Sequence, residues 1–283
     1  SGVVGQEMMK CLENESSFDG SLRLVASARS AGQVVNTSKG SYTIEELSEK
    51  VFVGMDIALF AAGGDISKEW APVAVKNGCL VIDNSSYFRY EESVPLVVPE
   101  INGVVAKNNQ GIIANPNCTT AIAALPLWVI EQNFGLKKVI MSTYQAVSGA
   151  GKEGMDELLK QVDQYNNGDT LEVNKFSRQI LFNLIPQIDV FLDNNYTKEE
   201  MKVVWELRKI FSKPALAVSC TAVRIPVIRA HSESIVIETE KKIDPAEVRK
   251  LFAETPGIQV VDDPTNLQYP TPLTATNKYA VEV

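Results

Sequence analysis

The chain has 283 residues and a mass of 31.0 kDa, enough for two domains of ordinary size. Hydrophobic residues make up 45% of it and charged residues 22%, so a large core can form and wholesale disorder is excluded. The formal net charge of −8 gives no general attraction to nucleic acid or to an anionic membrane surface, so we expect neither as a partner. An anionic small substrate would have to be held by a few placed arginines and lysines.

The first half of the chain alternates short apolar runs with amphipathic segments. Strands are expected over 22–26, 56–62, 79–82 and 111–114. Helices are expected over 6–14, from an N-cap at Ser67 to Gly78, and over 119–133 with Gly135 closing the last. Strands separated by helices are typical of a doubly wound parallel sheet, because parallel neighbours need a crossover connection. The pattern therefore predicts an α/β protein with an N-terminal Rossmann-like domain over 1–118.

The second half has longer strand-like runs and fits an α+β domain over 119–283. Its expected strands cover 138–147, 216–228 and 234–240, and its expected helices cover 152–165 and 198–211. Thr197 with Glu200 forms a capping-box pattern, and Asp244 before Pro245 forms an N-cap pattern. These two patterns predict where two helices begin.

Both ends of the chain look cut. The chain opens with a Gly-x-x-Gly that runs straight into a helix, without the strand that normally precedes a dinucleotide-binding loop, and it stops inside a strand-like run at 279–283. It has no signal peptide and no apolar run of 18 residues. We expect a cytoplasmic protein. The alternative of an organelle-targeting peptide before the first residue is left open.

Cys118 is the candidate nucleophile among four cysteines. It follows a strand and a tight turn and stands in the first turn of a helix, where backbone N–H groups are expected to lower the pKa of a thiol and to hold an oxyanion. A free cysteine is more often a small buried hydrophobe. The other three, at 11, 79 and 220, lie in apolar patterns, and no CxxC spacing suggests a metal site.

Several charged residues are candidate ligands of a substrate or a cofactor. His231 is the only histidine, and Arg224 precedes it in an apolar strand, where a guanidinium needs an anionic partner. A lone histidine is more often structural. Other candidates are Glu199 and Lys202, which share a helix face, Arg89 after a strand, and Arg29 with Ser30 at the place where a dinucleotide site reads the ribose. No acidic residue stands beside Arg29, which favours NADP over NAD.

Five motifs stand in a fixed order along the chain. They are NPNCTT at 115–120, STYQAVSGAGKEG at 142–154, PQIDVF at 186–191, EEMK at 199–202 and VRIPVIRAHSES at 223–234. In this order they resemble the aspartate-semialdehyde dehydrogenase family over nearly the whole chain. The resemblance implies an NADP-dependent oxidoreductase that converts 4-aspartyl phosphate to L-aspartate 4-semialdehyde and inorganic phosphate through a cysteine thioester, in lysine, threonine and methionine biosynthesis. It also implies a homodimer or homotetramer built through the second domain.

The resemblance implies a role for each matching residue. Cys118 would be the nucleophile, Gln145 would orient the bound intermediate, and His231 would be the general acid and base. The substrate would be held by Arg224 at its carboxylate, by Glu199 at its amino group, and by Arg89 and Lys202 at its phosphate. The cofactor would be held by Ser1, Gly2, Val3, Val4, Arg29, Ser30, Ser148 and Gly149.

Three other functions are weighed at this point. An enzyme of the N-acetylglutamyl-phosphate reductase kind also pairs a cysteine with a histidine, but its acetylated substrate would leave the Glu199 carboxylate without a cationic partner. A non-catalytic scaffold would need no nucleotide. A plain cysteine hydrolase would leave Arg29 and the glycine pair unexplained.

Overall fold

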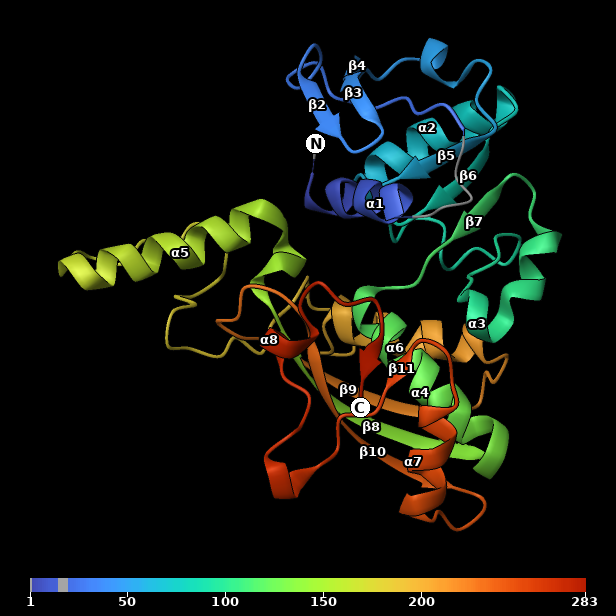
Figure 1. The fold of residues 1–283 in the computed structure, drawn as a ribbon, viewed down its shortest axis with the longest axis vertical. Coiled ribbons are helices and arrows are strands. Elements are labelled where there is room, and N and C mark those ends of the chain that lie inside the picture. The colour runs from blue at the N-terminus through green and yellow to red at the C-terminus, as the bar shows by residue number, and fades with distance from the viewer. Residues whose placement is uncertain (1, 15–19) are drawn as a thin grey trace. The chain divides into compact units, whose positions relative to one another are not determined.

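The computed structural model describes residues 2–14 and 20–283 of the chain. The chain divides into two compact units, Ser1–Leu96 with Val105–Asn115 and Val97–Val104 with Pro116–Val283 (Figure 1). The first unit has a parallel sheet with helices, and the second has a mixed sheet with helices. This confirms the predicted α/β class, with a Rossmann-like N-terminal part.

The sheet of the first unit has three parallel strands in the order β5-β6-β7. They are β5 (Ile57–Phe60), β6 (Leu80–Asp83) and β7 (Ile112–Ala114). The helix α2 (Gly64–Lys76) makes the crossover between β5 and β6 and buries Ala71 and Ala74 completely. Because these side chains are small, the helix can lie close to the sheet. Between β6 and β7 the chain forms α3 (Pro99–Asn102) and the 3₁₀ helix η2 (Gly103–Asn108).

The start of α2 differs from the prediction. Ser67 is not the N-cap, because the helix begins at Gly64 after Gly63. The Ser67 hydroxyl is buried and donates to Asp83 at the end of β6, with 2.8 Å between the oxygens. The hydroxyl and the backbone N–H of Ser85 also donate to the Asp83 carboxylate. A serine that resembled a helix cap therefore satisfies a buried carboxylate instead.

The remaining elements of the first unit are short. The helix α1 (Val3–Asn14) confirms the first predicted helix, whereas the strand predicted over 22–26 is only β1 (Val25–Ala26), paired in parallel with β4 (Glu45–Glu46). An antiparallel hairpin of β2 (Val34–Thr37) and β3 (Gly40–Thr43) was not predicted. A short 3₁₀ helix, η1 (Glu49–Phe52), follows.

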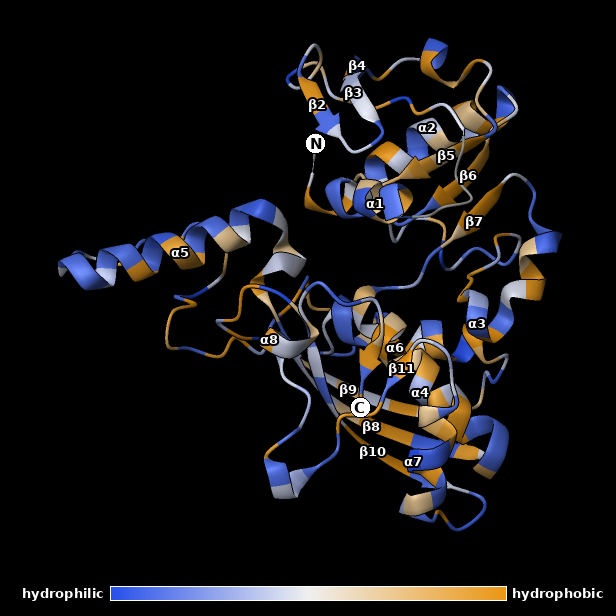
Figure 2. Ribbon diagram, in the orientation of Figure 1, coloured by the Kyte–Doolittle hydropathy of each residue, from blue (hydrophilic) through white to orange (hydrophobic). Residues whose placement is uncertain are grey.

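The second unit is built on a three-stranded sheet in the order β10-β8-β9. Its strands are β8 (Leu136–Gln145), β9 (Ala217–Arg224), which is parallel to β8, and β10 (Ser232–Thr239), which is antiparallel to it. The helices α4 (Cys118–Phe134) and α6 (Lys198–Ile210) contact these strands. Figure 2 shows the apolar colour that β8, β10 and α4 share.

The two faces of this sheet differ. Val139, Met141, Thr143 and Gln145 of β8 are buried, as expected for every second residue of a strand covered on one face. The alternate residues point the other way, and Ile140 stays 49% exposed. The capping box of Thr197 and Glu200 is present at the start of α6, as predicted.

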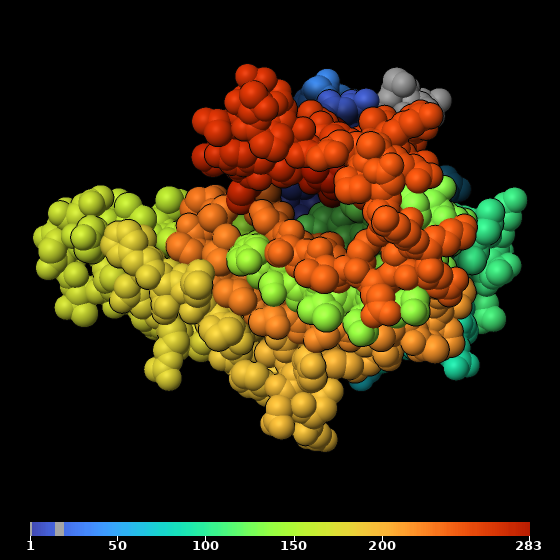
Figure 3. All heavy atoms as spheres, turned by 90° about the horizontal axis from the view of Figure 1, so that it is seen from below, coloured from blue at the N-terminus to red at the C-terminus, as the bar shows by residue number. Residues whose placement is uncertain are grey.

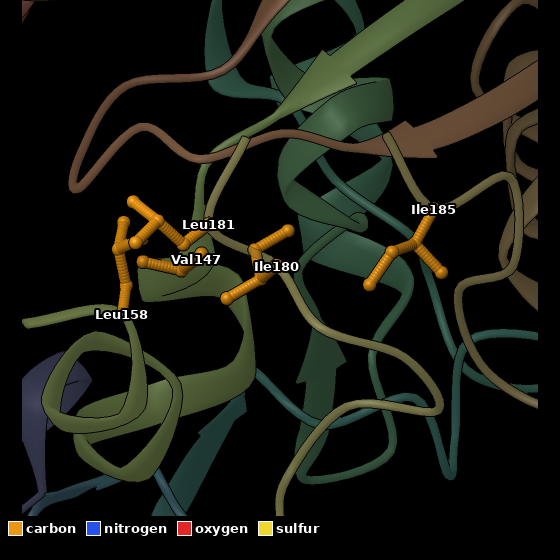
Figure 4. Close-up of a cluster of buried hydrophobic side chains, with 5 residues drawn as sticks. All are labelled: Val147, Leu158, Ile180, Leu181 and Ile185. Carbon is orange, nitrogen blue, oxygen red and sulfur yellow. The ribbon is translucent and has the colours of Figure 1, made fainter. Parts of the chain in front are cut away.

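The helix α5 (Gly151–Asn167) holds the irregular segment that follows it, and in Figure 3 the yellow-green and yellow atoms of the two lie together at the left of the view. It begins after the 3₁₀ helix η3 (Val147–Ala150). Glu157 accepts from the backbone N–H of Asn174, and Gln161 accepts from those of Ile180 and Leu181. An apolar cluster completes the attachment (Figure 4); it comprises Val147, Leu158, Ile180, Leu181 and Ile185.

The C-terminal part of the second unit packs on α4. Asp244 caps α7 (Pro245–Ala253) as predicted, accepting from the N–H of Ala246. Leu251 and Phe252 of this helix pack with Leu125 and Val129 of α4. The other elements are β11 (Ile258–Gln259), the 3₁₀ helix η4 (Pro264–Asn266), α8 (Pro272–Ala275) and β12 (Val281–Glu282), which pairs with β11.

Candidate active site

The candidate site of the second unit lies where β8 and β9 end. The register places Gln145, the last residue of β8, opposite Arg224, the last residue of β9. Parallel strands end at the same sheet edge, so two residues far apart in sequence become neighbours. At this edge β10 begins, with Ser232 opposite Tyr144, directly after His231. Three of the predicted site residues therefore lie at one sheet edge.

Cys118 is the first residue of α4, one residue before the predicted start of the helix, and so stands in the first turn as predicted. The side chain of Asn117 caps this helix by accepting from the N–H of Thr119, with 2.9 Å between the atoms. The Cys118 side chain is exposed, yet the protein around its thiol raises the pKa, and the negative charge of Glu199 raises it further. Hydrogen bonds from Thr119 and the charge of Arg224 only reduce this rise. The prediction that the helix terminus lowers the pKa of Cys118 is therefore wrong for the net shift. Near neutral pH the side chain is a thiol.

Glu199 connects α4, β8 and α6. Its Oε1 accepts from the Asn117 amide at 3.0 Å and from the Gln145 amide at 3.1 Å, and its Oε2 accepts from Lys202 at 2.9 Å. Burial alone would raise the pKa of Glu199, but the charge and hydrogen bond of Lys202 and the two amides lower it below its usual range. The residue is a buried, fully ionised carboxylate.

Lys202 is held by two carboxylates. Its ammonium donates to Glu199 and, at 2.8 Å, to Asp189, which has a left-handed backbone with φ of 68°. Burial lowers the pKa of Lys202, but the two carboxylates outweigh burial and raise it. The side chain is only 12% exposed, so Glu199 and Lys202 do not form an ordinary solvated surface pair.

Arg224 and His231 both bond to the backbone of Ala146. The Arg224 guanidinium donates to the Ala146 carbonyl at 2.6 Å, and the Ala146 N–H donates to Nδ1 of His231 at 2.9 Å. Burial, and then the charge of Arg224, lower the pKa of His231 to about 4, against a weaker opposing effect of Glu199. His231 is therefore neutral near pH 7.

Two predicted cofactor residues also lie beside this group. Ser148 donates its backbone N–H to the carbonyl of Ile228. Gly149 has so little space that a Cβ there would lie 2.7 Å from Nη1 of Arg224 and 3.2 Å from Nε2 of His231. A side chain at position 149 would therefore force the Arg224 guanidinium to shift and would press tightly against His231.

The other predicted residues belong to the first unit. Arg89 is buried and donates to the carbonyl of Asn84 at 2.8 Å. Arg29 is exposed in the turn after β1, where Ser30 donates its N–H to the Ser27 carbonyl. Gly2, Val3 and Val4 lie at the start of α1, and Ser1 lies outside the described residues.

Three supporting residues were missed by the sequence reasoning. Asn117 caps the helix that begins at Cys118 and binds Glu199, Thr143 donates to Oε1 of Gln145 at 3.0 Å, and Glu206 accepts from the Asn117 N–H at 2.6 Å. Thr143 lies two residues before Gln145, so strand alternation could have placed it on the same face. No comparable local signal marks Glu206, because its contact depends on the packing of α6 against the turn before α4.

Glu233 is a half-buried carboxyl near this edge. It lies on β10 opposite Thr143, and its Oε1 is buried with no hydrogen-bond partner in the described part of the chain. Burial raises the pKa of Glu233 to about 8. The native protein therefore keeps this proton where the unfolded chain releases it.

We expect Glu233→Gln to stabilise the protein at neutral and alkaline pH. Below about pH 4 Glu233 is protonated in both the native and the unfolded wild type and does not lower the free energy of unfolding. As the pH rises, the carboxyl ionises only in the unfolded chain, and the free energy of unfolding falls by up to about 1.4 kcal/mol per pH unit. The decrease is complete near pH 8. Glutamine removes this loss. Urea unfolding of the wild type and of Glu233→Gln, at intervals between about pH 5 and pH 8, measures this difference in the free energy of unfolding. The control is Glu238→Gln, which changes an exposed glutamate on the same strand. Parallel pH profiles of wild type and Glu233→Gln would contradict the expectation.

Two wider searches complete the description. Within 2–14 and 20–283, no group of three or more histidine, cysteine, aspartate or glutamate side chains could hold a metal ion. Over the same residues, no helix is both long enough and apolar enough to cross a membrane.

Comparison with known families places both units in one class. Residues 1–109 match the family described as semialdehyde dehydrogenase, NAD binding domain, and residues 127–283 match semialdehyde dehydrogenase, dimerisation domain. Curated aspartate-semialdehyde dehydrogenases of Aquifex aeolicus and Bacillus subtilis are each 46% identical over 100% of the chain and 84% of the relative. A crystal structure of aspartate semialdehyde dehydrogenase II complexed with ASA from Vibrio cholerae is 42% identical, with a TM-score of 0.95 over 98% of this chain and 83% of that one. The chain belongs to the aspartate-semialdehyde dehydrogenase family.

Proposed function

We propose that this chain carries aspartate-semialdehyde dehydrogenase activity, the NADPH-dependent reduction of 4-aspartyl phosphate to L-aspartate 4-semialdehyde and inorganic phosphate. This reaction stands in lysine, threonine and methionine biosynthesis. The observation that carries the proposal is one sheet edge at which a guanidinium, an ionised carboxylate, an amide and a single histidine converge, with the cysteine's helix cap bonded to that carboxylate. The names of the relatives support the substrate.

The charges of the site match an α-amino acid. Arg224 would bind the substrate carboxylate through two parallel hydrogen bonds, and Glu199 would bind its ammonium group. Glu199 is ionised and only 5% exposed, so its charge is weakly screened. Lys202 and Arg89 are proposed to hold the phosphate. Gln145, held by Glu199 and Thr143, would orient the bound intermediate.

The residues proposed for the cofactor leave room for it. A Cβ at Gly2 would meet nothing within 4 Å, so a phosphate could approach the N–H groups at the start of α1, which Val3 and Val4 begin. Arg29 and Ser30 are proposed for the 2′-phosphate. When bound, NADPH supplies the hydride for the reduction.

The chemistry of the chain's own residues begins at Cys118. The Cys118 thiol gives its proton to a base, which we propose is His231; the sulfur then attacks the acyl-phosphate carbonyl, the bond from that carbon to the phosphate oxygen breaks, phosphate leaves with the bonding electrons, and a thioester forms. A thiolate suits this exchange because it adds and leaves readily. After reduction the carbon–sulfur bond breaks, which releases the aldehyde and regenerates the cysteine. His231 is proposed to be the general acid and base that takes the thiol proton and returns it when the cysteine is released, and Ser148 and Gly149 are proposed to contact the cofactor.

We also propose that two copies assemble through the second unit. The outer face of its sheet exposes Ile140 (49%), Tyr144 (41%) and Val236 (64%), more apolar side chains than a sheet face in water usually carries. The matched dimerisation domain supports a homodimer, and a homotetramer would need a further interface.

The activity is tested by phosphate-dependent reduction of NADP with L-aspartate 4-semialdehyde, measured by NADPH absorbance on the full-length protein. We expect activity that requires phosphate and falls at least about 100-fold with the N-acetylated glutamate analogue, because that substrate leaves the buried Glu199 without a cation. Replacing NADP by NAD in the same assay measures the cofactor preference. Equal rates without phosphate, or a preference for the acetylated substrate, would refute the proposed reaction.

A further inference from the structure

Asn117, the residue directly before the candidate nucleophile, has its backbone and its side chain bonded on every side. Its backbone N–H donates to Oε2 of Glu206, with 2.6 Å between the atoms, and its carbonyl accepts from the N–H of Ala121 at 2.8 Å. Its side-chain amide donates to Glu199 at 3.0 Å, and its side-chain oxygen accepts from the N–H of Thr119 at 2.9 Å. The peptide groups on both sides of Asn117 are therefore held in place.

The bond to Glu206 anchors the turn that leads into α4. The residue before Asn117 is Pro116, which has no backbone N–H, so the Asn117 N–H is the donor by which this part of the turn can be fastened. Asn117 is buried, with 7% of it exposed, and a buried N–H that loses its acceptor is costly. The turn therefore depends on the oxygen that Glu206 supplies.

The two carboxyl groups that hold Asn117 come from one face of α6. Glu199 and Glu206 lie seven residues apart on this helix, which is close to two turns, so both side chains leave the helix on the same side. Both are buried, with exposed fractions of 5% and 0%. Glu199 bonds to the side chain of Asn117 and Glu206 bonds to its backbone. The helix that is proposed to recognise the substrate ammonium group thus also holds the turn before Cys118.

We propose that Glu206 is a positioning residue, which holds the Asn117 N–H and thereby fixes the turn that presents the Cys118 thiol to the substrate. Glu206 acts on the thiol through Asn117. Because Glu199 and Glu206 belong to one helix, the same helix sets the place of the nucleophile and the place of the substrate's ammonium group, and a reaction between them gains from that fixed geometry. The identity of the substrate rests on the proposed function, whereas the positioning of the thiol does not.

Two variants of similar size separate the hydrogen bond from the packing. Glutamine at position 206 keeps an oxygen that can accept the Asn117 N–H, whereas methionine fills the space with only a weakly accepting sulfur. We expect Glu206→Gln to keep kcat within about 5-fold of wild type and Glu206→Met to lower it by at least about 50-fold. The KM for L-aspartate 4-semialdehyde should change by less than about 3-fold in both, because Glu199 and Arg224 remain to bind the substrate.

The thiol can also be measured without substrate, by the rate at which iodoacetamide alkylates it at different pH values. In a Cys11→Ala background Cys118 is the exposed cysteine, since the other two are buried. The exclusion of water by the surrounding protein and the charge of Glu199 raise the pKa of this thiol, and hydrogen bonds from Thr119 reduce that rise. These bonds need the first turn of α4 in its native shape. We expect the alkylation profile to move up by at least about 0.5 pH unit in Glu206→Met and to stay in place in Glu206→Gln.

Glu131→Met is the matched control for a mere loss of stability. Glu131 also accepts a backbone N–H, that of Leu136 at 2.6 Å, but at the other end of α4. We expect this variant to unfold more easily and yet to keep kcat within about 3-fold of wild type and the alkylation profile unchanged.

Three results would overturn the role of Glu206. They are an unchanged alkylation profile in a folded Glu206→Met protein, an equal loss of kcat in Glu206→Gln and Glu206→Met, and an equal loss of kcat in Glu131→Met. A wild type without the proposed activity would refute the proposed function alone, because the alkylation profiles would still decide whether Glu206 positions the thiol.

Discussion

Replacing Cys118 by alanine is expected to lower kcat by about 10⁴-fold or more, because no other group in the site can form the thioester. Its position at the start of α4, behind the Asn117 cap, leaves the thiol exposed. Phosphate-dependent NADPH formation measures the loss. NADP binding, followed by fluorescence quenching, should persist in the variant.

The matched control is Cys11→Ala, which removes another exposed thiol and should leave the rate within about 2-fold of wild type. The surrounding protein partly excludes water from the Cys118 sulfur and Glu199 is negatively charged, and both effects raise the pKa of the thiol, so the wild-type rate should also rise with pH across the neutral range. A Cys118→Ala protein that keeps more than about one hundredth of the wild-type rate would exclude the covalent mechanism.

Replacing Arg224 by alanine is expected to lower kcat/KM by about 10²- to 10³-fold. The substrate carboxylate loses its partner, the Ala146 carbonyl loses a donor, and the positive charge beside His231 disappears. Steady-state kinetics with L-aspartate 4-semialdehyde give the magnitude, and the unfolding midpoint of the variant shows whether the fold is intact.

Arg224→Lys is the informative comparison, because it keeps the charge and loses the planar fork that binds a carboxylate in two places. We expect it to recover less than about a tenth of the lost activity. If lysine restored the full rate, a point charge would suffice, and the paired hydrogen bonds to the substrate carboxylate would not be needed.

Local signals explain which parts of the fold were predictable. The Thr197 and Asp244 caps fix helix starts because the side chain that accepts the first N–H groups stands next to the helix in sequence. The prediction of Ser67 as an N-cap was wrong because it used the same local signal. A serine before a helical pattern resembles a cap even when its hydroxyl donates to a buried carboxylate, as here to Asp83. The hairpin at 34–43 was missed because its strands are short and largely exposed, without a clear apolar alternation.

The site was predictable as a set of residues but not as a set of contacts. The motifs indicated Glu199, Arg224 and His231, yet only the register of β8 and β9 and the packing of α6 show what each one touches. The prediction of a low pKa for Cys118 was wrong because it used only a local feature, the start of a helix. The effects that raise this pKa, the exclusion of water by the surrounding protein and the charge of Glu199, arise from the tertiary fold.

The parallel pairing of β8 with β9 also bears on how the second unit folds. The chain between Gln145 and Ala217 must close into one long connection before these strands can align, and the entropy of that closure is lost before any strand contact compensates for it. Gln145 and Arg224 become neighbours only after this slow step. We therefore expect catalytic competence to emerge late in refolding, after the helices have formed.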